Sequence, residues 1–187
     1  ADVWINGKHV MQHAGGYTPF VVDATGLLKT GKENELLVRL DNRNNSLIPP
    51  GKPLETLDFC YYGGIYRNVH LIAKADVHIT HPILDDHPEG QGIFITYPKV
   101  SQELSVVDAK TEIKNTSDKE KVVELRHTFY TWKKQKGKDK KVQNISETLT
   151  LHPGVTIENN QPMEVKHPAL WSQDAQNLYV LSTDRAE

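Results

Sequence analysis

Short apolar segments, interrupted at close intervals by structure-breaking residues, are the feature that most constrains the fold of this 187-residue chain. The segments are rich in Val, Ile, Leu, Thr and aromatic residues, and Gly, Pro, Asn and Asp separate them. This composition and spacing are typical of β-strands joined by turns. Because no long stretch keeps the 3.6-residue period of an amphipathic helix, we expect an all-β protein.

The first part of the chain opens with a predicted β-hairpin. Its strands are Asp2–Ile5 and Lys8–Gln12, and they flank Asn6-Gly7, a dipeptide whose residues both tolerate a positive φ. Further strands are expected at Leu36–Leu40 and Val69–Ala73. Ser46–Pro53 holds three prolines that cannot donate to a β-ladder, so it is predicted to be a long surface loop.

A domain boundary is predicted near residues 74–82, where a strand-like run gives way to His81-Pro82. We therefore expect two domains, 1–76 and 77–187. The strands expected in the second are Gly92–Tyr97, Leu104–Asn115, Val122–Trp132, Val142–Leu151, Val155–Glu158, Met163–Lys166 and Leu178–Thr183. Their number and spacing fit a β-sandwich of immunoglobulin type. His127 alternates with polar neighbours in its strand and is predicted on the buried face.

Charge and composition exclude several classes of function. The net charge of −2 argues against a nucleic-acid partner, which usually requires a broad basic face. No apolar run is long enough to span a membrane as a helix. The single cysteine, Cys60, excludes a disulfide framework within the chain. The lysine-rich run 133–141 is interpreted as a solvated hairpin tip rather than a polyanion site.

The usual catalytic motifs are not found. The sequence has no G-x-S-x-G elbow and no phosphate-binding glycine loop. The histidine pairs His9/His13 and His78/His81 lack the helical setting that makes such spacing useful for a metal, so no metal site is predicted. Asn34-Glu35 follows Gly31 and leads into a strand, which indicates a turn rather than a glycosidase acid/base.

One cluster in the first part combines glycines, aromatic residues and polar groups. It contains Gly15–Phe20 and the segment Asp58–Arg67, together with Asn6 and Asp23. Sugars bind to such surfaces because aromatic faces stack on the C–H face of the ring while carboxylates and amides bind the hydroxyls. A purely structural interpretation, with glycines in tight turns and aromatic residues in a core, is equally compatible with the composition.

At this cluster the sequence resembles glycoside hydrolase family 2, the β-galactosidases, β-glucuronidases and β-mannosidases. The resemblance rests on Asn6-Gly7, Gly15-Gly16-Tyr17-Thr18-Pro19-Phe20 and Gly63-Gly64-Ile65-Tyr66-Arg67, and later on Pro168-Ala169-Leu170-Trp171-Ser172. It implies a partial galactose-binding-like jelly roll, which begins partway through the domain, followed by an immunoglobulin-like β-sandwich. In the family, two glutamates about 5 Å apart perform a retaining hydrolysis, and both belong to a barrel beyond Glu187.

The resemblance also implies roles for particular residues. Asp58 aligns with an aspartate that holds galactose hydroxyls near a sodium ion, and Asn6 with an asparagine at the same end of the pocket. Tyr61 and Tyr62 are neighbouring candidates for substrate binding. Structural roles are expected for Arg67, which would brace the loop, and for Trp171. No catalytic residue and no cofactor are assigned within the chain, although sodium or magnesium is expected in a full enzyme.

The resemblance thus implies the non-catalytic front portion of a bacterial β-galactosidase that acts on terminal β-galactosides. The alternatives are the same portion of a β-glucuronidase and a free-standing carbohydrate-binding module. Expected partners are the β-galactoside, the catalytic barrel of the same protein and further copies in a homo-oligomer, with no nucleic acid and no membrane. The sequence leaves the compartment open between the bacterial cytoplasm and the periplasm.

Overall fold

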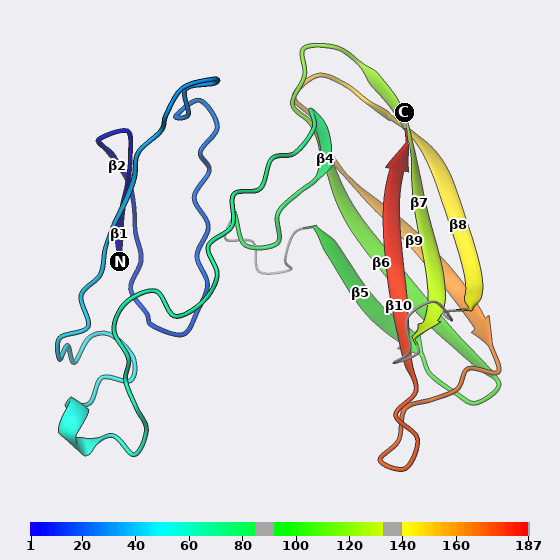
Figure 1. Ribbon diagram of the computed structural model, residues 1–187. Coiled ribbons are helices and arrows are strands. Elements are labelled where there is room, and N and C mark those ends of the chain that lie inside the picture. The colour runs from blue at the N-terminus through cyan, green and yellow to red at the C-terminus, as the bar shows by residue number, and fades with distance from the viewer. Residues whose placement is uncertain (85–91, 133–139, 187) are drawn as a thin grey trace. The chain divides into compact units, whose positions relative to one another are not determined.

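The computed structural model describes residues 1–84, 92–132 and 140–186 of the chain. The chain divides into unit 1, Ala1–Ile72, and unit 2, Ala73–Glu187. Within the described residues, all regular structure is β-strand except for one 3-10 helix, η1 at Leu54–Thr56 (Figure 1). None of these residues forms a helix long and apolar enough to cross a membrane. The all-β prediction is therefore confirmed.

Unit 1 contains one small antiparallel sheet. Its strands are β1 (Asp2–Ile5), β2 (Lys8–Gln12) and β3 (Leu36–Arg39), in the order β2-β1-β3. The predicted hairpin is confirmed, because Asn6 and Gly7 take positive φ values of 50° and 79° between β1 and β2. Val3 and Ile5 are the buried hydrophobic residues of the unit, whereas many of its loop side chains are exposed.

The strand predicted at Val69–Ala73 is wrong. The segment is irregular, and the side chains of Val69 and Leu71 are 63% and 81% exposed. A strand needs a neighbouring strand for its backbone hydrogen bonds, and no described segment pairs with this one. A high β-propensity does not produce a strand without such pairing.

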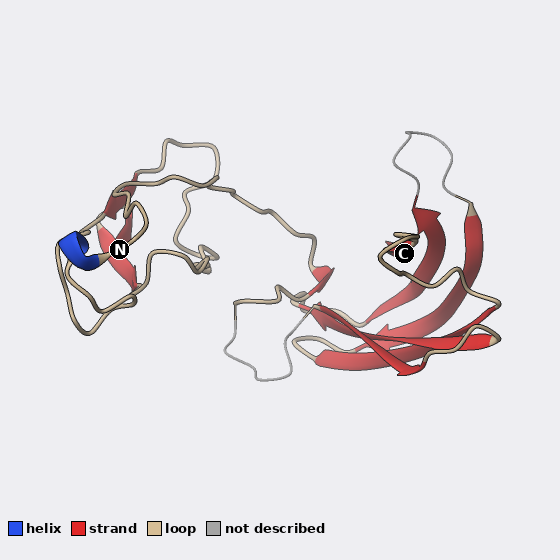
Figure 2. Cartoon of the chain, turned by 90° about the horizontal axis from the view of Figure 1, so that it is seen from below, coloured by secondary structure: helices blue, strands red, loops and turns tan. Residues whose placement is uncertain are grey.

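Unit 2 is a sandwich of two antiparallel sheets (Figures 1 and 2). In one sheet the central strand β6 pairs with β4 and β5 on one side and with β9 on the other. In the second sheet the order is β10-β7-β8. The strands are β4 (Val77–Ile79), β5 (Ile93–Lys99), β6 (Leu104–Asn115), β7 (Lys121–Trp132), β8 (Lys141–Leu151), β9 (Thr156–Lys166) and β10 (Leu178–Ala186). The predicted lysine-rich tip lies largely outside the described residues.

β9 corrects a second prediction. The sequence suggested two short strands interrupted between Glu158 and Met163, but β9 runs without a break through Pro162. β9 pairs only with β6 among the described strands, so it lies at a sheet edge, where a residue without an N–H is tolerated. Asn159 and Gln161 are buried polar residues here, so the expected apolar alternation is interrupted although the strand continues.

The core of unit 2 lies between its two sheets. Inward-facing residues alternate regularly with outward-facing ones along β6, where every second residue from Ser105 to Asn115 is buried. His127 on β7 is fully buried, as its place in the alternating pattern predicted. Buried hydrophobic residues from both sheets form two clusters, and these clusters account for the burial of the central strands.

Candidate sugar-binding site

Two loops that are far apart in the sequence of unit 1 meet at one place. Tyr66 donates a hydrogen bond from its hydroxyl to the carbonyl oxygen of Gly16 at 2.8 Å, across a separation of 50 residues. The Tyr61 ring also lies against Gly16, where an added Cβ would be 3.4 Å from the Tyr61 hydroxyl. The structure therefore brings together the Gly15–Phe20 motif and the Asp58–Arg67 segment.

Aromatic rings form the centre of this contact. Tyr17 meets Phe59 and Tyr61 edge-on, with centroids 6.3 and 6.1 Å away. The pKa of the Tyr17 phenol is raised, first by desolvation and then by the neighbouring phenols of Tyr61 and Tyr66. The Tyr17 hydroxyl therefore stays protonated at neutral pH and can both donate and accept hydrogen bonds.

Asp58 and Tyr62 are the open groups of the Asp58–Arg67 segment. Asp58 is exposed, and no hydrogen bond or ion pair to its carboxylate occurs among the described residues. Tyr62 is 75% exposed, whereas Tyr61 is half-buried against the glycine loop. The segment thus contains a free carboxylate and, four residues later, an exposed ring, which can serve as hydrogen-bond acceptor and stacking surface for a polar ligand.

The side-chain amide of Asn6 is engaged in hydrogen bonds within unit 1. Its Nδ2 group donates to the carbonyl oxygen of Leu27 at 2.9 Å and to Oδ1 of Asn34 at 2.8 Å. Its Oδ1 accepts from the backbone N–H of Glu35 at 3.1 Å. Both amide hydrogens therefore have protein partners, so an accepting lone pair on Oδ1 is what Asn6 can still offer to a ligand.

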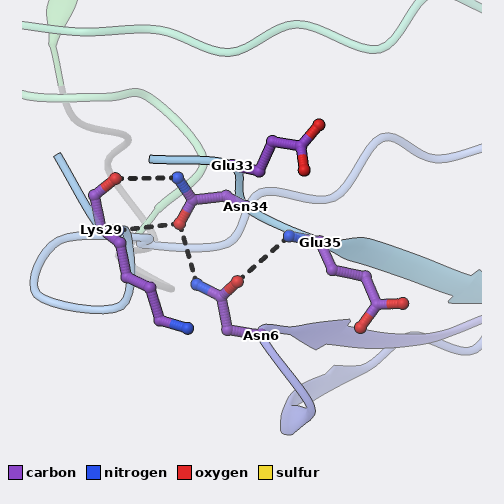
Figure 3. Close-up of a pocket in the computed structure, with 5 residues that line it drawn as sticks. All are labelled: Asn6, Lys29, Glu33, Asn34 and Glu35. Carbon is purple, nitrogen blue, oxygen red and sulfur yellow. Dashed lines mark hydrogen bonds between the residues drawn. The ribbon is translucent and has the colours of Figure 1, made fainter. Parts of the chain in front are cut away.

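Asn6 lines a shallow depression with Lys29, Glu33, Asn34 and Glu35 (Figure 3). Asn34 closes the turn beneath it, since its amide bonds to both the N–H and the carbonyl oxygen of Lys29 at 2.7 and 3.0 Å. The carboxylates of Glu33 and Glu35 point away from the amide pair (Figure 3). Asn34 and Glu35 lie in an irregular stretch between the turn that ends at Gly31 and the start of β3, and the acidic groups of Glu33 and Glu35 do not converge on one point.

Sequence reasoning missed the supporting contacts of the site. A Cβ added to Gly63 would lie 2.6 Å from Nδ2 of Asn42, so a larger residue there would displace the Asn42 amide from its place against this loop. Arg67 places its guanidinium 5.8 Å from the centre of the Tyr66 ring. The repeated glycines were a visible signal, but their partner Asn42 was not.

Trp171 lies in unit 2, on the segment between β9 and β10, and is 60% exposed. Its neighbours are ordered by local hydrogen bonds, including one from the Ala169 N–H to the Tyr179 hydroxyl at 2.8 Å. Asn177 also donates to the carbonyl oxygen of Leu170 at 2.9 Å. The structural role of Trp171 stays a prediction.

A cation site would need more ligands than the cluster provides. Among the residues that the structure describes, no three His, Cys, Asp or Glu side chains come together in a group that could hold a metal ion. Asp58 would therefore contribute one carboxylate to a sodium or magnesium ion, and other ligands would have to come from elsewhere.

Comparison with known proteins assigns both units. The family described as "Glycosyl hydrolases family 2, sugar binding domain" matches residues 1–75. The family described as "Glycosyl hydrolases family 2" matches residues 91–185. The chain belongs to glycosyl hydrolase family 2. The recognition from sequence is thereby confirmed, as is the fold of jelly-roll portion plus immunoglobulin-like sandwich.

Relatives in this family carry two different names. A β-glucuronidase of Bacteroides fragilis is 32% identical over 177 residues, covering 92% of this chain and 23% of the relative. A β-galactosidase of Thermoanaerobacter pseudethanolicus is 46% identical over 80 residues, which is 42% of this chain and 10% of the relative. The chain therefore spans less than a quarter of either relative.

Similar solved structures also carry both enzyme names. A β-glucuronidase of Bacteroides uniformis has a TM-score of 0.81 and 32% identity, over 98% of this chain and 20% of its own. A putative β-galactosidase from Bacteroides fragilis has a TM-score of 0.81 and 31% identity, over the whole of this chain and 26% of its own. The family is thus established, whereas the sugar is not.

Proposed function

We propose that this chain is the non-catalytic front portion of a β-galactosidase and that unit 1 forms one wall of its sugar pocket. The observation that carries the proposal is the free carboxylate of Asp58, in the same segment whose Phe59 and Tyr61 rings meet Tyr17. An ionised carboxylate accepts hydrogen bonds from two sugar hydroxyls, and such charge-assisted bonds are strong. Tyr62 provides an exposed ring for the C–H face of the sugar.

The charge of Asp58 favours a neutral sugar. The carboxylate has no cationic partner among the described residues, so its negative charge stays uncompensated in the wall. A glucuronic acid residue carries its own carboxylate, which would be repelled at short range. A galactoside carries none. This difference supports β-galactoside as the substrate of the parent enzyme.

The β-glucuronidases among the relatives favour a second candidate. They include the 32% identical protein of Bacteroides fragilis, which aligns over most of the chain. If the parent enzyme is a β-glucuronidase, Asp58 would have to lie far from the substrate carboxylate or be paired by a cation from another domain. The two candidates therefore make opposite predictions for removal of the Asp58 charge.

The decisive experiment uses the complete protein that contains this chain, assayed with chromogenic β-galactoside and β-glucuronide. We expect preferential cleavage of the galactoside, and Asp58→Asn should lower its kcat/KM by about tenfold or more, because charged hydrogen bonds contribute about 1.5–3 kcal/mol. Preference for the glucuronide, or an unchanged Asp58→Asn enzyme, contradicts the proposal. Asp41→Asn is a matched control, since Asp41 pairs with Arg43 at an exposed site.

The chain by itself tests the remaining alternative. One wall of a pocket makes few of the contacts that offset the loss of ligand freedom, so galactose and lactose should bind the 187-residue chain very weakly in calorimetry. No hydrolysis by the chain is expected, because the catalytic glutamates are proposed to lie in a separate barrel. A micromolar dissociation constant would instead identify a free-standing carbohydrate-binding module.

A further inference from the structure

A belt of polar side chains crosses the core of unit 2. It separates the hydrophobic cluster around Leu125 and Ile113 from the cluster around Phe129 and Met163. We call it the polar belt, and its members are Thr183, His127, Thr111, Gln161, Asn159 and, at its exposed end on β8, Glu147. Polar groups inside a core need hydrogen-bond partners, so the belt can be examined donor by donor.

His127 is the centre of one half of the belt. Its Nε2 lies 3.2 Å from the Thr111 hydroxyl, and its Nδ1 lies 2.9 Å from the Thr183 hydroxyl. Burial lowers the pKa of the imidazole, which keeps the ring neutral. A neutral imidazole has one N–H donor and one acceptor nitrogen. One threonine therefore donates to the ring, and the other accepts from it.

Gln161 is the centre of the other half. Its Nε2 donates to Oδ1 of Asn159 at 2.9 Å and to the carbonyl oxygen of Leu125 at 3.5 Å. Asn159 in turn donates to the carboxylate of Glu147 at 2.8 Å. Gln161 is 2% exposed, and its Oε1 has no partner among the described residues. This half of the belt therefore contains an acceptor without a donor.

The first half contains a donor that matches it. The threonine that accepts from the imidazole keeps its own hydroxyl proton, which needs a further acceptor. Thr111 pairs with Asn159, and Ala109 with Gln161, so Thr111 and Gln161 are diagonal neighbours on one face of β6 and β9. Diagonal neighbours in a sheet lie about 7–8 Å apart between Cα atoms, a separation that suits one bridging molecule rather than a direct bond.

We propose that one internal water molecule bridges the Thr111 hydroxyl and Oε1 of Gln161, and that neutral His127 carries its proton on Nε2. Thr183 then donates to Nδ1, Thr111 accepts from Nε2–H and donates to the water, and the water donates to Gln161. Buried water characteristically satisfies such otherwise unpaired groups. The belt becomes continuous from β10 through β7, β6 and β9 to β8, and so links both sheets.

The tautomer is tested on the unmodified chain by ¹⁵N spectroscopy of its imidazoles near neutral pH. The resonances of His127 are identified by their loss in His127→Gln. We expect a protonated Nε2 and an unprotonated Nδ1. We also expect magnetisation transfer from a long-lived water molecule to Thr111 and Gln161. An Nδ1–H tautomer, or the lack of such a transfer at Thr111 and Gln161, overturns the proposal.

A double-mutant cycle tests the bridge independently. Thr111→Val and Gln161→Met should each lower the thermal midpoint, and the double variant should lose clearly less than the sum of the two losses, because either change already removes the bridge. Additive losses would overturn the bridge. Thr148→Val, on the exposed face of β8, is the matched control and should add to Gln161→Met without coupling. If a variant fails to fold, the spectroscopy of the unmodified chain still decides.

Discussion

Unit 1 and unit 2 are built from similar β-forming sequences but bury very different amounts of apolar surface. Unit 2 closes two sheets over each other, and its hydrophobic clusters include residues such as Ile113 and Leu125 that are completely inaccessible to water. Unit 1 has one three-stranded sheet and buries Val3 and Ile5, while large side chains in its loops stay exposed. Burial of apolar surface is the dominant favourable term in folding, so unit 2 should account for most of the stability of the chain.

The two units also differ in the role of their polar side chains. The candidate sugar-binding groups, including Asp58 and Tyr62, lie on loops of unit 1, where polar and aromatic side chains are free to contact a ligand. The buried histidine and amides of unit 2 face one another and are engaged in the polar belt. Exposed polar groups here suggest binding, whereas buried polar groups organise the core.

The largest expected difference between the units is in the effect of truncating one leucine in each. Leu125→Ala should reduce the free energy of unfolding by about 2–5 kcal/mol, because it leaves a cavity in a fully buried cluster. Leu71→Ala in unit 1 should change it by less than about 0.5 kcal/mol, because that side chain is 81% exposed. Urea unfolding of both variants measures the contrast. Equal losses would show that unit 1 contains a core comparable to that of unit 2.

Much of this contrast could be predicted from the sequence. The long strands of unit 2 and the buried position of His127 follow from strict alternation, which needs only local information. Val69–Ala73 had the right composition for a strand but has no partner strand, and β9 continues where Asn159 and Gln161 interrupted the apolar pattern. Pairing with a distant segment decided both cases, and local propensity contains no information on it.

The candidate site was likewise predictable only in part from the sequence. The motifs around Gly16 and Tyr66 could be seen in the sequence, but their contact across 50 residues could not. The hydrogen-bond partners of Asn6 are 21, 28 and 29 residues away, so the sequence could not show that its amide hydrogens are already engaged. Residue types at a site are therefore predictable, whereas the remaining hydrogen-bonding capacity of each depends on tertiary contacts.

Replacing one asparagine in each unit should have an intermediate effect on the free energy of unfolding. Asn115 in unit 2 is fully buried and donates to the carbonyl oxygens of Lys119 and Leu151 at 2.7 and 3.0 Å. Asn115→Ala should cost about 1–3 kcal/mol, because it leaves a buried acceptor unpaired. Asn6→Ala should cost about 0.5–1.5 kcal/mol, since water can replace the lost partners at a partly exposed turn.

Hydrogen exchange followed by mass spectrometry distinguishes these two effects by location. Asn115→Ala should increase exchange throughout β6 and β9, whereas Asn6→Ala should increase it only in the hairpin of β1 and β2 and near Glu35. Global deprotection by Asn6→Ala would contradict the view that unit 1 contributes little to overall stability.

The smallest expected effect is a dependence of unit 2 on pH through His127. Burial lowers the pKa of this imidazole in the folded chain, while in the unfolded chain it titrates near its ordinary value of about 6.5. The unfolded state therefore binds more protons as the pH falls through about 6.5, so stability decreases on acidification and is fully present above that pH. The charged groups on the strands beside it are Glu147 on β8 and Arg185 on β10. Thermal midpoints measured from pH 5 to 8 should rise with pH, and His127→Gln should flatten this profile. His70→Gln, at an exposed position of unit 1, is the control and should leave the slope of the profile unchanged. A slope that persists in His127→Gln would assign the effect to another group and remove the buried imidazole from the difference between the two units.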